Sequence, residues 1–218
     1  MVLRNYPDFI KSFLHFSSSV PAPGKFLKWA ALSIVAGALE RKVWIRNAGY
    51  LLHPNLYIML VGDPGISRKS TSSQTAMKIL RKVPDMYFLS TQVTSASMIL
   101  AMRESGLNRY VKLNGLSYHN SSSFLYSSEA AVTLKEIQGS IIELLTDFYD
   151  CQPNGWNTGE ETPWEKRTKS DGPIRIFNPC LNMLACSTPN YLKYKNSQQV
   201  YLQIPYEIEA RMVERSWF

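Results

Sequence analysis

Cysteine and histidine are scarce in this chain of 218 residues, which contains three of each. The cysteines, Cys151, Cys180 and Cys186, are odd in number and lack the spacing of a zinc site, and the histidines are isolated from one another. These features exclude a zinc-cluster protein and a small secreted domain held by disulfides. They favour buried thiols in a reducing compartment, and we predict a cytoplasmic protein.

Long uncharged apolar runs are also absent. The most apolar stretch, FLKWAALSIVAGALERKVW, contains Lys28 and, near its end, Glu40, Arg41 and Lys42. Its uncharged part is shorter than the roughly 20 residues that span a membrane, so we predict a buried helix and no membrane association. Charged residues from Arg4 onward interrupt the first apolar positions, so we expect no secretory signal peptide.

Acidic side chains are outnumbered by basic ones, with 17 Asp and Glu against 24 Lys and Arg and a net charge of +7. A basic excess suits a polyanionic partner such as nucleic acid. The basic residues are scattered rather than gathered in one tract, so charge alone leaves nucleic-acid contact open. The 45% hydrophobic content is typical of a folded globular protein.

The apolar pattern changes character along the chain. Residues 6 to 46 have helical spacing around a Pro/Gly break, and from residue 55 apolar runs of strand length alternate with helices. We expect strands in NLYIMLVG, DMYFLSTQV, SSFLYSSE and IRIFNPCLNMLACSTP, a hairpin within YVKLNGLSYHN, and an exposed hairpin or loop in PNGWNTGEETPWEKRTKSDGP. We expect helices in TSSQTAMKILRKV, in SASMILAMRES with Thr94 or Ser95 as its cap, and in KEIQGSIIELLTDFYDC.

This alternation predicts an α/β fold, with a mainly parallel sheet flanked by helices and preceded by an N-terminal helical segment. We divide the chain into an N-terminal helical subdomain, residues 1–50, and a core, residues 51–218. Within that core, the segment LYIMLVGDPGISRKSTSSQTAMKIL resembles the strand, phosphate-binding loop and helix of a P-loop NTPase of the RecA or AAA+ kind.

The loop of this segment has the parts that phosphate binding needs. Gly62 and Gly65 can adopt backbone angles barred to other residues, and the helix N-terminus aims its N–H groups at an anion. Lys69 can reach the β- and γ-phosphates of ATP, and the Ser70 hydroxyl can bind Mg²⁺. The whole candidate binding loop comprises Gly62, Asp63, Pro64, Gly65, Ile66, Ser67, Arg68, Lys69, Ser70 and Thr71.

The loop departs from the usual pattern G-x-x-x-x-G-K-[ST] in one respect. Counted back from Lys69, the first glycine position falls on Asp63 and the second on Arg68. The loop is therefore one residue longer than usual or lacks the glycine beside the lysine. Arg68 either points away from the phosphates or contacts them as a planar cation. A strand–turn–helix connection that contains Lys-Ser by chance is the alternative.

Two further strand ends supply candidate side chains. Glu129 follows the strand SSFLYSSE and is our candidate for activating water, while Ser128 replaces the usual aspartate and is a weak Mg²⁺ candidate. Ser187 and Thr188 end another strand and are candidate sensors of the γ-phosphate. A solvated strand end or helix cap at Glu129, and a plain strand exit at Ser187, are the alternatives.

With these residues in place, the chain resembles a family of phage- and mobile-element-encoded P-loop ATPases associated with replication helicases or primases (the DUF3987 type). The resemblance rests on ALERKVW, HPNLYIMLVGDPGISRKST, FLYSSE, LLTDFYDC and NPCLNMLACSTPNYL. It implies Mg²⁺-dependent ATP hydrolysis coupled to DNA, single-stranded or at a replication fork, in the host cytoplasm. Arg-Lys-Ser-Thr is a familiar form of the loop in that family, and a homo-oligomer is compatible with it.

One departure concerns the end of the chain. Such ATPases continue to an arginine that stabilises the transition state, often from a neighbouring subunit. Here the chain ends with YEIEARMVERSWF, which does not match the family. Arg211 and Arg215 are candidates for the role of that arginine. One expectation is therefore a truncated form with slow or absent ATP turnover. Two other functions stay open: a nucleic-acid-binding accessory protein that hydrolyses ATP poorly or not at all, and, ranked last, a P-loop kinase for a small metabolite.

Overall fold

The structure is a computed structural model of the whole chain, and it describes residues 8–47, 50–91, 94–113, 115–133, 140–151, 161–168 and 172–189. The helices are α1 (Phe9–Phe16), α2 (Gly24–Leu39), α3 (Lys69–Leu80), α4 (Ser95–Ser105), α5 (Ala130–Thr133) and α6 (Ser140–Tyr149). The strands are β1 (Ile45–Asn47), β2 (Tyr50–Leu52), β3 (Tyr57–Val61), β4 (Tyr110–Leu113), β5 (Leu116–His119), β6 (Ser121–Ser127), β7 (Pro163–Thr168), β8 (Gly172–Phe177) and β9 (Pro179–Ser187).

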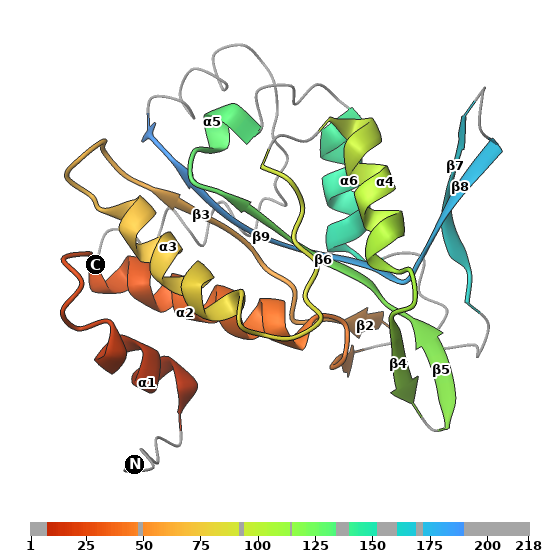
Figure 1. The fold of residues 1–218 in the computed structure, drawn as a ribbon, viewed down its shortest axis with the longest axis horizontal. Helices are drawn as coiled ribbons and strands as arrows, with labels where there is room; N and C mark the ends of the chain where they lie inside the picture. Colours follow the sequence, from red (N-terminus) through yellow and green to blue (C-terminus); the bar gives the residue numbers. More distant parts are fainter. Residues whose placement is uncertain are drawn as a thin grey trace.

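A parallel sheet in the order β3-β9-β6 forms the centre of the molecule (Figure 1). Strand β9 lies in the middle, and all of its residues are buried. Such burial is expected of a strand with parallel neighbours on both edges and helices over both faces. The predicted α/β fold with a parallel sheet is therefore confirmed.

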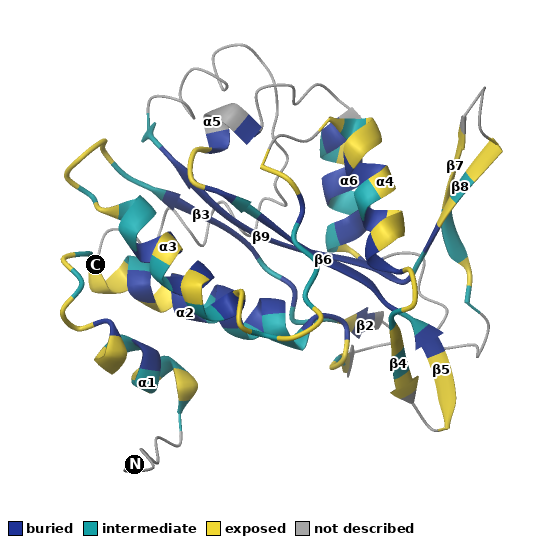
Figure 2. Cartoon of the chain, viewed as in Figure 1, coloured by how far each residue is buried: buried dark blue, intermediate teal, exposed yellow. Residues whose placement is uncertain are grey.

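Alternating side chains of the three strands enter two different cores, because successive residues of a strand point to opposite faces. On β3, Ile58 and Leu60 pack with α2 and α3, whereas Tyr57 and Met59 pack with α4 and α6. Figure 2 shows the buried sides of these helices turned toward the sheet from both faces. The two cores keep both faces of the sheet dry, so the functional groups of the strands must lie at the strand ends.

The N-terminal helices share the core of the sheet. Ala30 and Ile34 of α2 belong to the same buried cluster as Leu60 of β3 and Leu184 of β9. The short β1–β2 hairpin, in which Asn47 pairs with Tyr50, spans the boundary that the sequence places at residue 50. Helix α2 thus acts as one of the covering layers of the sheet.

The segment DMYFLSTQV, predicted as a strand, makes only a single parallel bridge, from Phe88 to Phe124 of β6. Leu89 N–H donates to Phe124 O over 3.0 Å, and Phe124 N–H donates to Tyr87 O over 2.9 Å. Asp85 has a left-handed φ of 59°, which turns the chain just before this contact. The strand prediction was wrong in extent, since the described part of the segment touches the edge of β6 at one point only.

Two hairpins, β4–β5 and β7–β8, lead directly into β6 and β9. In the second, β7 lies within the polar segment expected to be an exposed hairpin or loop, but its partner β8 lies mostly in the following apolar run. Residues 152–160 and 169–171 lie outside the described part. The apolar run IRIFNPCLNMLACSTP is not one strand, because Asn178 with φ of 51° separates β8 from β9. Both hairpins therefore sit at the amino ends of the parallel strands.

Helix α4 begins where the capping pattern predicts. The Thr94 side chain accepts from the Ser97 N–H over 3.2 Å, and the Ser97 hydroxyl accepts from the Thr94 N–H over 2.8 Å.

Within the described residues, none of the helices has the length and apolarity needed to cross a membrane.

Candidate functional site

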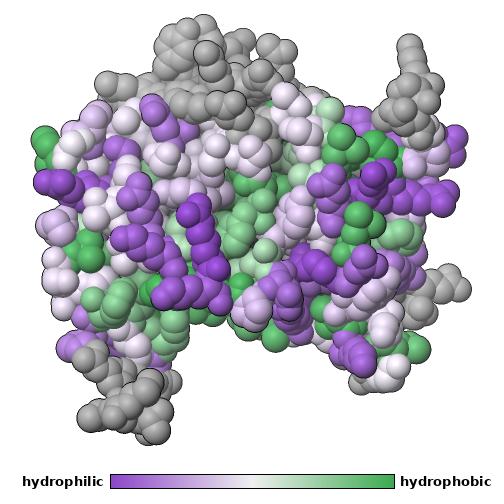
Figure 3. All heavy atoms as spheres, viewed as in Figure 1, coloured by the Kyte–Doolittle hydropathy of each residue, from purple (hydrophilic) through white to green (hydrophobic). Residues whose placement is uncertain are grey.

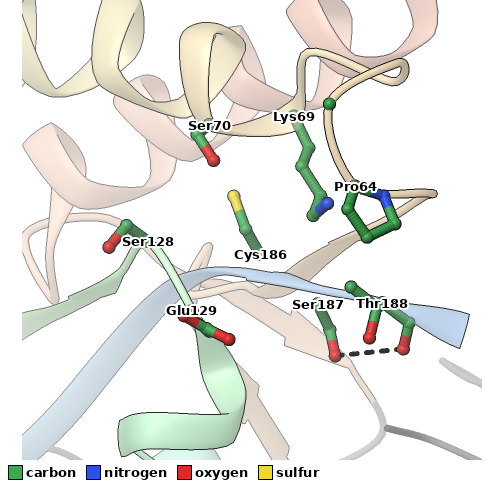
Figure 4. A pocket seen from close by; sticks show the side chains of 9 residues that line it. Pro64, Lys69, Ser70, Ser128, Glu129, Cys186, Ser187 and Thr188 are labelled. Atoms are coloured by element: carbon green, nitrogen blue, oxygen red, sulfur yellow. Dashed lines mark hydrogen bonds between the residues drawn. The ribbon is translucent and has the colours of Figure 1, made fainter. Parts of the chain in front are cut away.

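The carboxyl ends of β3, β6 and β9 meet at one edge of the sheet around a hollow of about 290 Å³ (Figure 4). In open α/β sheets this edge is where ligands bind. The hollow is lined by Pro64, Gly65, Lys69, Ser70, Ser128, Glu129, Cys186, Ser187 and Thr188. Three segments far apart in sequence thus contribute to one site.

The loop after β3 is tightly folded at Gly62. Its N–H donates to the Ser187 carbonyl over 3.2 Å, which joins the loop to the end of β9. A Cβ atom at Gly62 would lie 2.6 Å from both Cβ and Oγ of Ser67, so a side chain there would force the loop open. Gly65 has φ of +75°, a conformation that favours glycine. Both glycines are therefore required by the path of the chain.

The Lys69 ammonium group lies across the loop. Its Nζ donates to the Gly62 carbonyl over 3.0 Å and to the Asp63 carbonyl over 3.4 Å. The Ser67 hydroxyl also donates to the Asp63 carbonyl, over 2.7 Å. These bonds hold the lysine at the wall of the hollow, with its positive charge facing the space between the three strand ends.

Arg68 adopts the left-handed conformation, with φ of 49° and ψ of 27°. This is the position at which the common phosphate-binding pattern has glycine, and the backbone angles give the reason. A residue with a Cβ pays roughly 1–2 kcal/mol to adopt them. The Arg68 side chain is exposed and does not line the hollow. Its guanidinium group therefore points elsewhere in this conformation.

The N-terminus of α3 has an unusual charge arrangement. Arg68 and Lys69 stand at the positive end of the helix dipole, there is no acidic residue in the first turn, and no side chain caps the helix. The first N–H groups of any α-helix have no partner within the helix. Cations at this end are unfavourable for the helix alone. An anion in the hollow would offset both costs.

A small polar cluster lies beneath the hollow. The Ser73 hydroxyl donates to the Ser70 carbonyl over 3.0 Å, lies 3.2 Å from the Tyr126 hydroxyl, and accepts from Cys186 Sγ over 3.3 Å. Burial raises the pKa of the Cys186 thiol and that of the Tyr126 phenol. Both groups are therefore neutral at physiological pH, and this cluster gives the hollow polar groups that carry no charge. The sequence analysis did not name Cys186 as a site residue. Side chains alternate along a strand, so Cys186 lies on the same face of β9 as Leu184, the face that α3 covers.

Glu129 is held by the turn that joins β6 to α5. The buried Ser127 hydroxyl accepts from the Glu129 N–H over 3.3 Å and from the Thr133 hydroxyl over 2.6 Å. The Glu129 side chain is exposed and reaches the hollow from the side opposite α3 (Figure 4). The turn fixes the backbone of Glu129, and its carboxylate is open to solvent.

The end of β9 supplies the third wall. Ser187 is buried and Thr188 half-buried, and the Ser187 hydroxyl donates to the Thr188 carbonyl over 3.5 Å. Asn182 lies within β9. Its Oδ1 accepts from the Leu56 N–H over 3.0 Å, so it links β9 to the start of β3 and lies away from the hollow.

The structure brings most of the predicted site residues together. Those that line the hollow are Pro64, Gly65, Lys69, Ser70, Ser128, Glu129, Ser187 and Thr188. Those that shape the loop or helix without lining the hollow are Gly62, Asp63, Ile66, Ser67, Arg68 and Thr71. Arg211 and Arg215 lie outside the described residues. Among the residues that the structure describes, no three His, Cys, Asp or Glu side chains are grouped as metal ligands.

Comparison with known proteins does not assign this chain to a family. No protein-family model, no curated protein and no solved structure matches the chain.

Proposed function

We propose that the hollow binds the phosphates of ATP and that the protein is a P-loop ATPase. The observation that carries this proposal is the start of α3, where Arg68 and Lys69 occupy the positive end of an uncapped helix beside the hollow. A triphosphate is the common biological anion that satisfies several helix N–H groups and a lysine together. The tight path at Gly62 and Gly65 supports the same ligand, because it keeps the loop backbone close to the hollow.

The strand order supports an ATPase of the additional-strand type, in which one strand lies between the loop strand and the strand that bears the acidic residue. Here β9 separates β3 from β6. The inserted strand places Lys69 and Glu129 on two sides of the same hollow. Ser187 and Thr188, at the end of the inserted strand, are suitably placed to sense the γ-phosphate.

Each side chain then has a role. Lys69 exchanges its carbonyl partners for β- and γ-phosphate oxygens, and Glu129 orients and deprotonates the attacking water. The Ser70 hydroxyl and the exposed Ser128 fit Mg²⁺, an ion that takes few protein oxygens and keeps several waters. When bound, Mg²⁺ would supply neutralisation of phosphate charge.

The biological setting remains the one implied by the resemblance, namely DNA replication by a phage or mobile element, with ATP hydrolysis coupled to DNA. The alternative is an accessory protein that binds nucleic acid and keeps the fold with little turnover. A measurement of ATP turnover separates the two functions. The structure does not, because the candidate transition-state arginines Arg211 and Arg215 lie outside the described residues.

The decisive experiment is an ATP titration with and without Mg²⁺ on the wild type, Lys69→Ala and Lys78→Ala. Lys78 is an exposed lysine in the same helix and serves as the matched control. We expect Lys69→Ala to weaken binding about 30-fold or more, because removing one partner of a close charge pair costs about 2 to 5 kcal/mol. Equal affinities for Lys69→Ala and the wild type would refute the phosphate site.

Hydrolysis is tested on the same proteins with Glu129→Gln added, in the presence and absence of single-stranded DNA. We expect Glu129→Gln to keep the ATP affinity and to lower kcat about 100-fold or more, since a positioned base contributes roughly 10² to 10⁴ in rate. Binding without turnover in the wild type favours the accessory protein.

A further inference from the structure

The outward face of the β4–β5 hairpin carries an aromatic and basic set of side chains. Val111 and its neighbour Tyr118 turn inward and pack with Leu51. Because side chains alternate along a strand, the cross-strand pair Tyr110 and His119 lies on the other face. Lys112 lies two residues from Tyr110 and shares that face. Tyr110 is 54% exposed.

The β7–β8 hairpin is arranged in the same way. Trp164 and its cross-strand partner Ile176 turn into the core beside α6. Phe177, Arg175 and Arg167 therefore lie on the opposite face. Hydrophilic and apolar side chains alternate on the surface of the molecule over β7 and β8 (Figure 3).

These two outward faces meet at a column of three rings. The His119 ring stacks on Phe177 with centroids 4.8 Å apart and planes inclined by 25°, and its centroid is also 4.8 Å from that of Tyr110. Glu161 holds the column in place. It accepts from both the backbone N–H and Nδ1–H of His119, each over 2.6 Å, and from Asn178 Nδ2 over 2.7 Å.

We name this surface the hairpin strip, and it consists of Lys112, Tyr110, His119, Phe177, Arg175 and Arg167. The rings lie in its middle and the cations at its two ends. Glu165 accepts from Arg175 and Arg167 over 3.1 and 3.3 Å. Exposed ion pairs of this kind contribute little free energy, so both arginines can exchange to a phosphate. The Glu161 carboxylate is already occupied by His119 and Asn178.

We infer that the hairpin strip is a binding surface for single-stranded nucleic acid. Aromatic faces flanked by cations are the two elements that such sites combine, because bases stack on the rings while lysine and arginine follow the phosphates. An acidic protein segment would use the cations but would leave the ring column without a partner. The net charge of +7 assists the approach of a polyanion.

The strip lies at the end of the sheet opposite the hollow. Its hairpins lead into the amino ends of β6 and β9, whereas Glu129 and Ser187 stand at or just beyond their carboxyl ends. Nucleic-acid binding at the strip does not need ATP at the hollow. The inference therefore deepens the proposed function, because it rests on the DNA partner proposed there and names the surface that binds it, and it can be tested separately from the ATP site.

The test is fluorescence anisotropy of a labelled oligothymidylate without nucleotide, over a range of salt concentrations. We expect Tyr110→Ala to bind about tenfold more weakly and Tyr110→Phe to bind like the wild type, because the stacking ring is retained. Arg175→Gln should reduce the slope of log affinity against log salt by about 0.7, the share of one phosphate contact on a single strand. Since Tyr110 and Arg175 are exposed, thermal unfolding should stay close to wild type.

Three variants away from the strip act as controls. Phe16→Ala removes an exposed ring on α1, Lys78→Gln removes an exposed cation on α3, and Lys69→Ala disables the proposed ATP site. All three should bind the oligothymidylate like the wild type. The inference is overturned by absent binding, by Tyr110→Ala binding equal to wild type, or by duplex DNA or poly-glutamate binding the strip as tightly as the single strand.

Discussion

The charged side chains at the two ends of the parallel sheet differ in burial and in their partners. At the amino ends of β6 and β9, charged side chains are buried and form hydrogen bonds within the fold. Glu40 is 2% exposed and accepts from Arg109 and Asn120, while Arg41 is fully buried and donates to the carbonyls of Cys151 and Pro179 over 2.8 Å each. These bonds tie the end of α2 to the starts of both strands.

At the carboxyl ends the charges face the hollow without neutralising each other. Lys69 donates to backbone carbonyls, and among the described residues neither Lys69 nor Glu129 forms a salt bridge. Each end also contains a residue with a positive φ, Glu40 at 51° and Arg68 at 49°. Glu40 is held there by its buried partners, whereas the Arg68 side chain has none within the described residues.

This difference separates charges that build the molecule from charges that are available to a ligand. Buried groups must be satisfied within the fold, because an unpaired buried charge is very costly. Groups at a binding site keep their capacity for an external partner. Loss of a charge should therefore reduce stability at one end and ligand affinity at the other.

The largest effect that we expect on stability is that of Glu40→Ala. It leaves Arg109 partly buried beside Asn120 without a carboxylate, which should lower the free energy of unfolding by about 3 to 5 kcal/mol. Urea unfolding measures this change. The matched control is Glu165→Ala, which removes an exposed carboxylate that binds two arginines and should leave the free energy of unfolding almost unchanged. Equal losses in the two variants would break the comparison.

A pH effect of intermediate size should arise at His53, whose Nδ1 donates to the Val43 carbonyl near the same end of the sheet. Burial, and then the charge of Arg41, lower its pKa from 6.5 to about 4. The folded state thus favours neutral His53. Its contribution is complete above the unfolded pKa and is lost as pH falls toward the folded one.

Between about pH 7 and about pH 5 this titration should cost about 2 kcal/mol of unfolding free energy. Unfolding curves of the wild type and His53→Gln at both pH values isolate the contribution, because other groups titrate in both proteins. A His53 ring with a pKa near 6.5 in an NMR titration would contradict the burial of the ring beside the Arg41 charge.

The smallest effect should occur at Arg68 and have the opposite sign. Arg68→Gly removes the cost of the left-handed backbone and should raise the free energy of unfolding by about 0.5 to 1 kcal/mol. Arg68→Ala removes the same cation but keeps the Cβ, so the difference between the variants reports the backbone alone. Thermal unfolding is a sufficient measurement. If the two variants are equally stable, the loop does not hold Arg68 in this conformation.

Local features of the structure were predictable from short stretches of sequence. The apolar run before Gly62 forms β3, Lys69 begins α3, and Thr94 caps α4. Each depends on contacts within a few residues, such as a side chain that reaches the third N–H of its own helix. The alternation of strands and helices likewise predicted helices on both faces of a parallel sheet.

Other features depend on partners far apart in the chain and were not predictable. The segment around Phe88 has strand composition, yet its described part makes one bridge, to Phe124 of β6. Cys186 joins the floor of the hollow only because Ser73 and Tyr126 come to lie beside it. The hairpin strip depends on His119 and Phe177, which belong to different hairpins.

The sequence by itself determined the composition of the loop and which residue types stand at the strand ends, since both follow from local pattern and backbone preference. Only the tertiary structure decided that β9 lies between β3 and β6 and that Lys69, Glu129 and Ser187 share one hollow. Strand order and register arise from burial of apolar faces between segments more than 50 residues apart, as between Leu60 and Leu184. No local pattern contains that information, because the free energy comes from the contact between the segments.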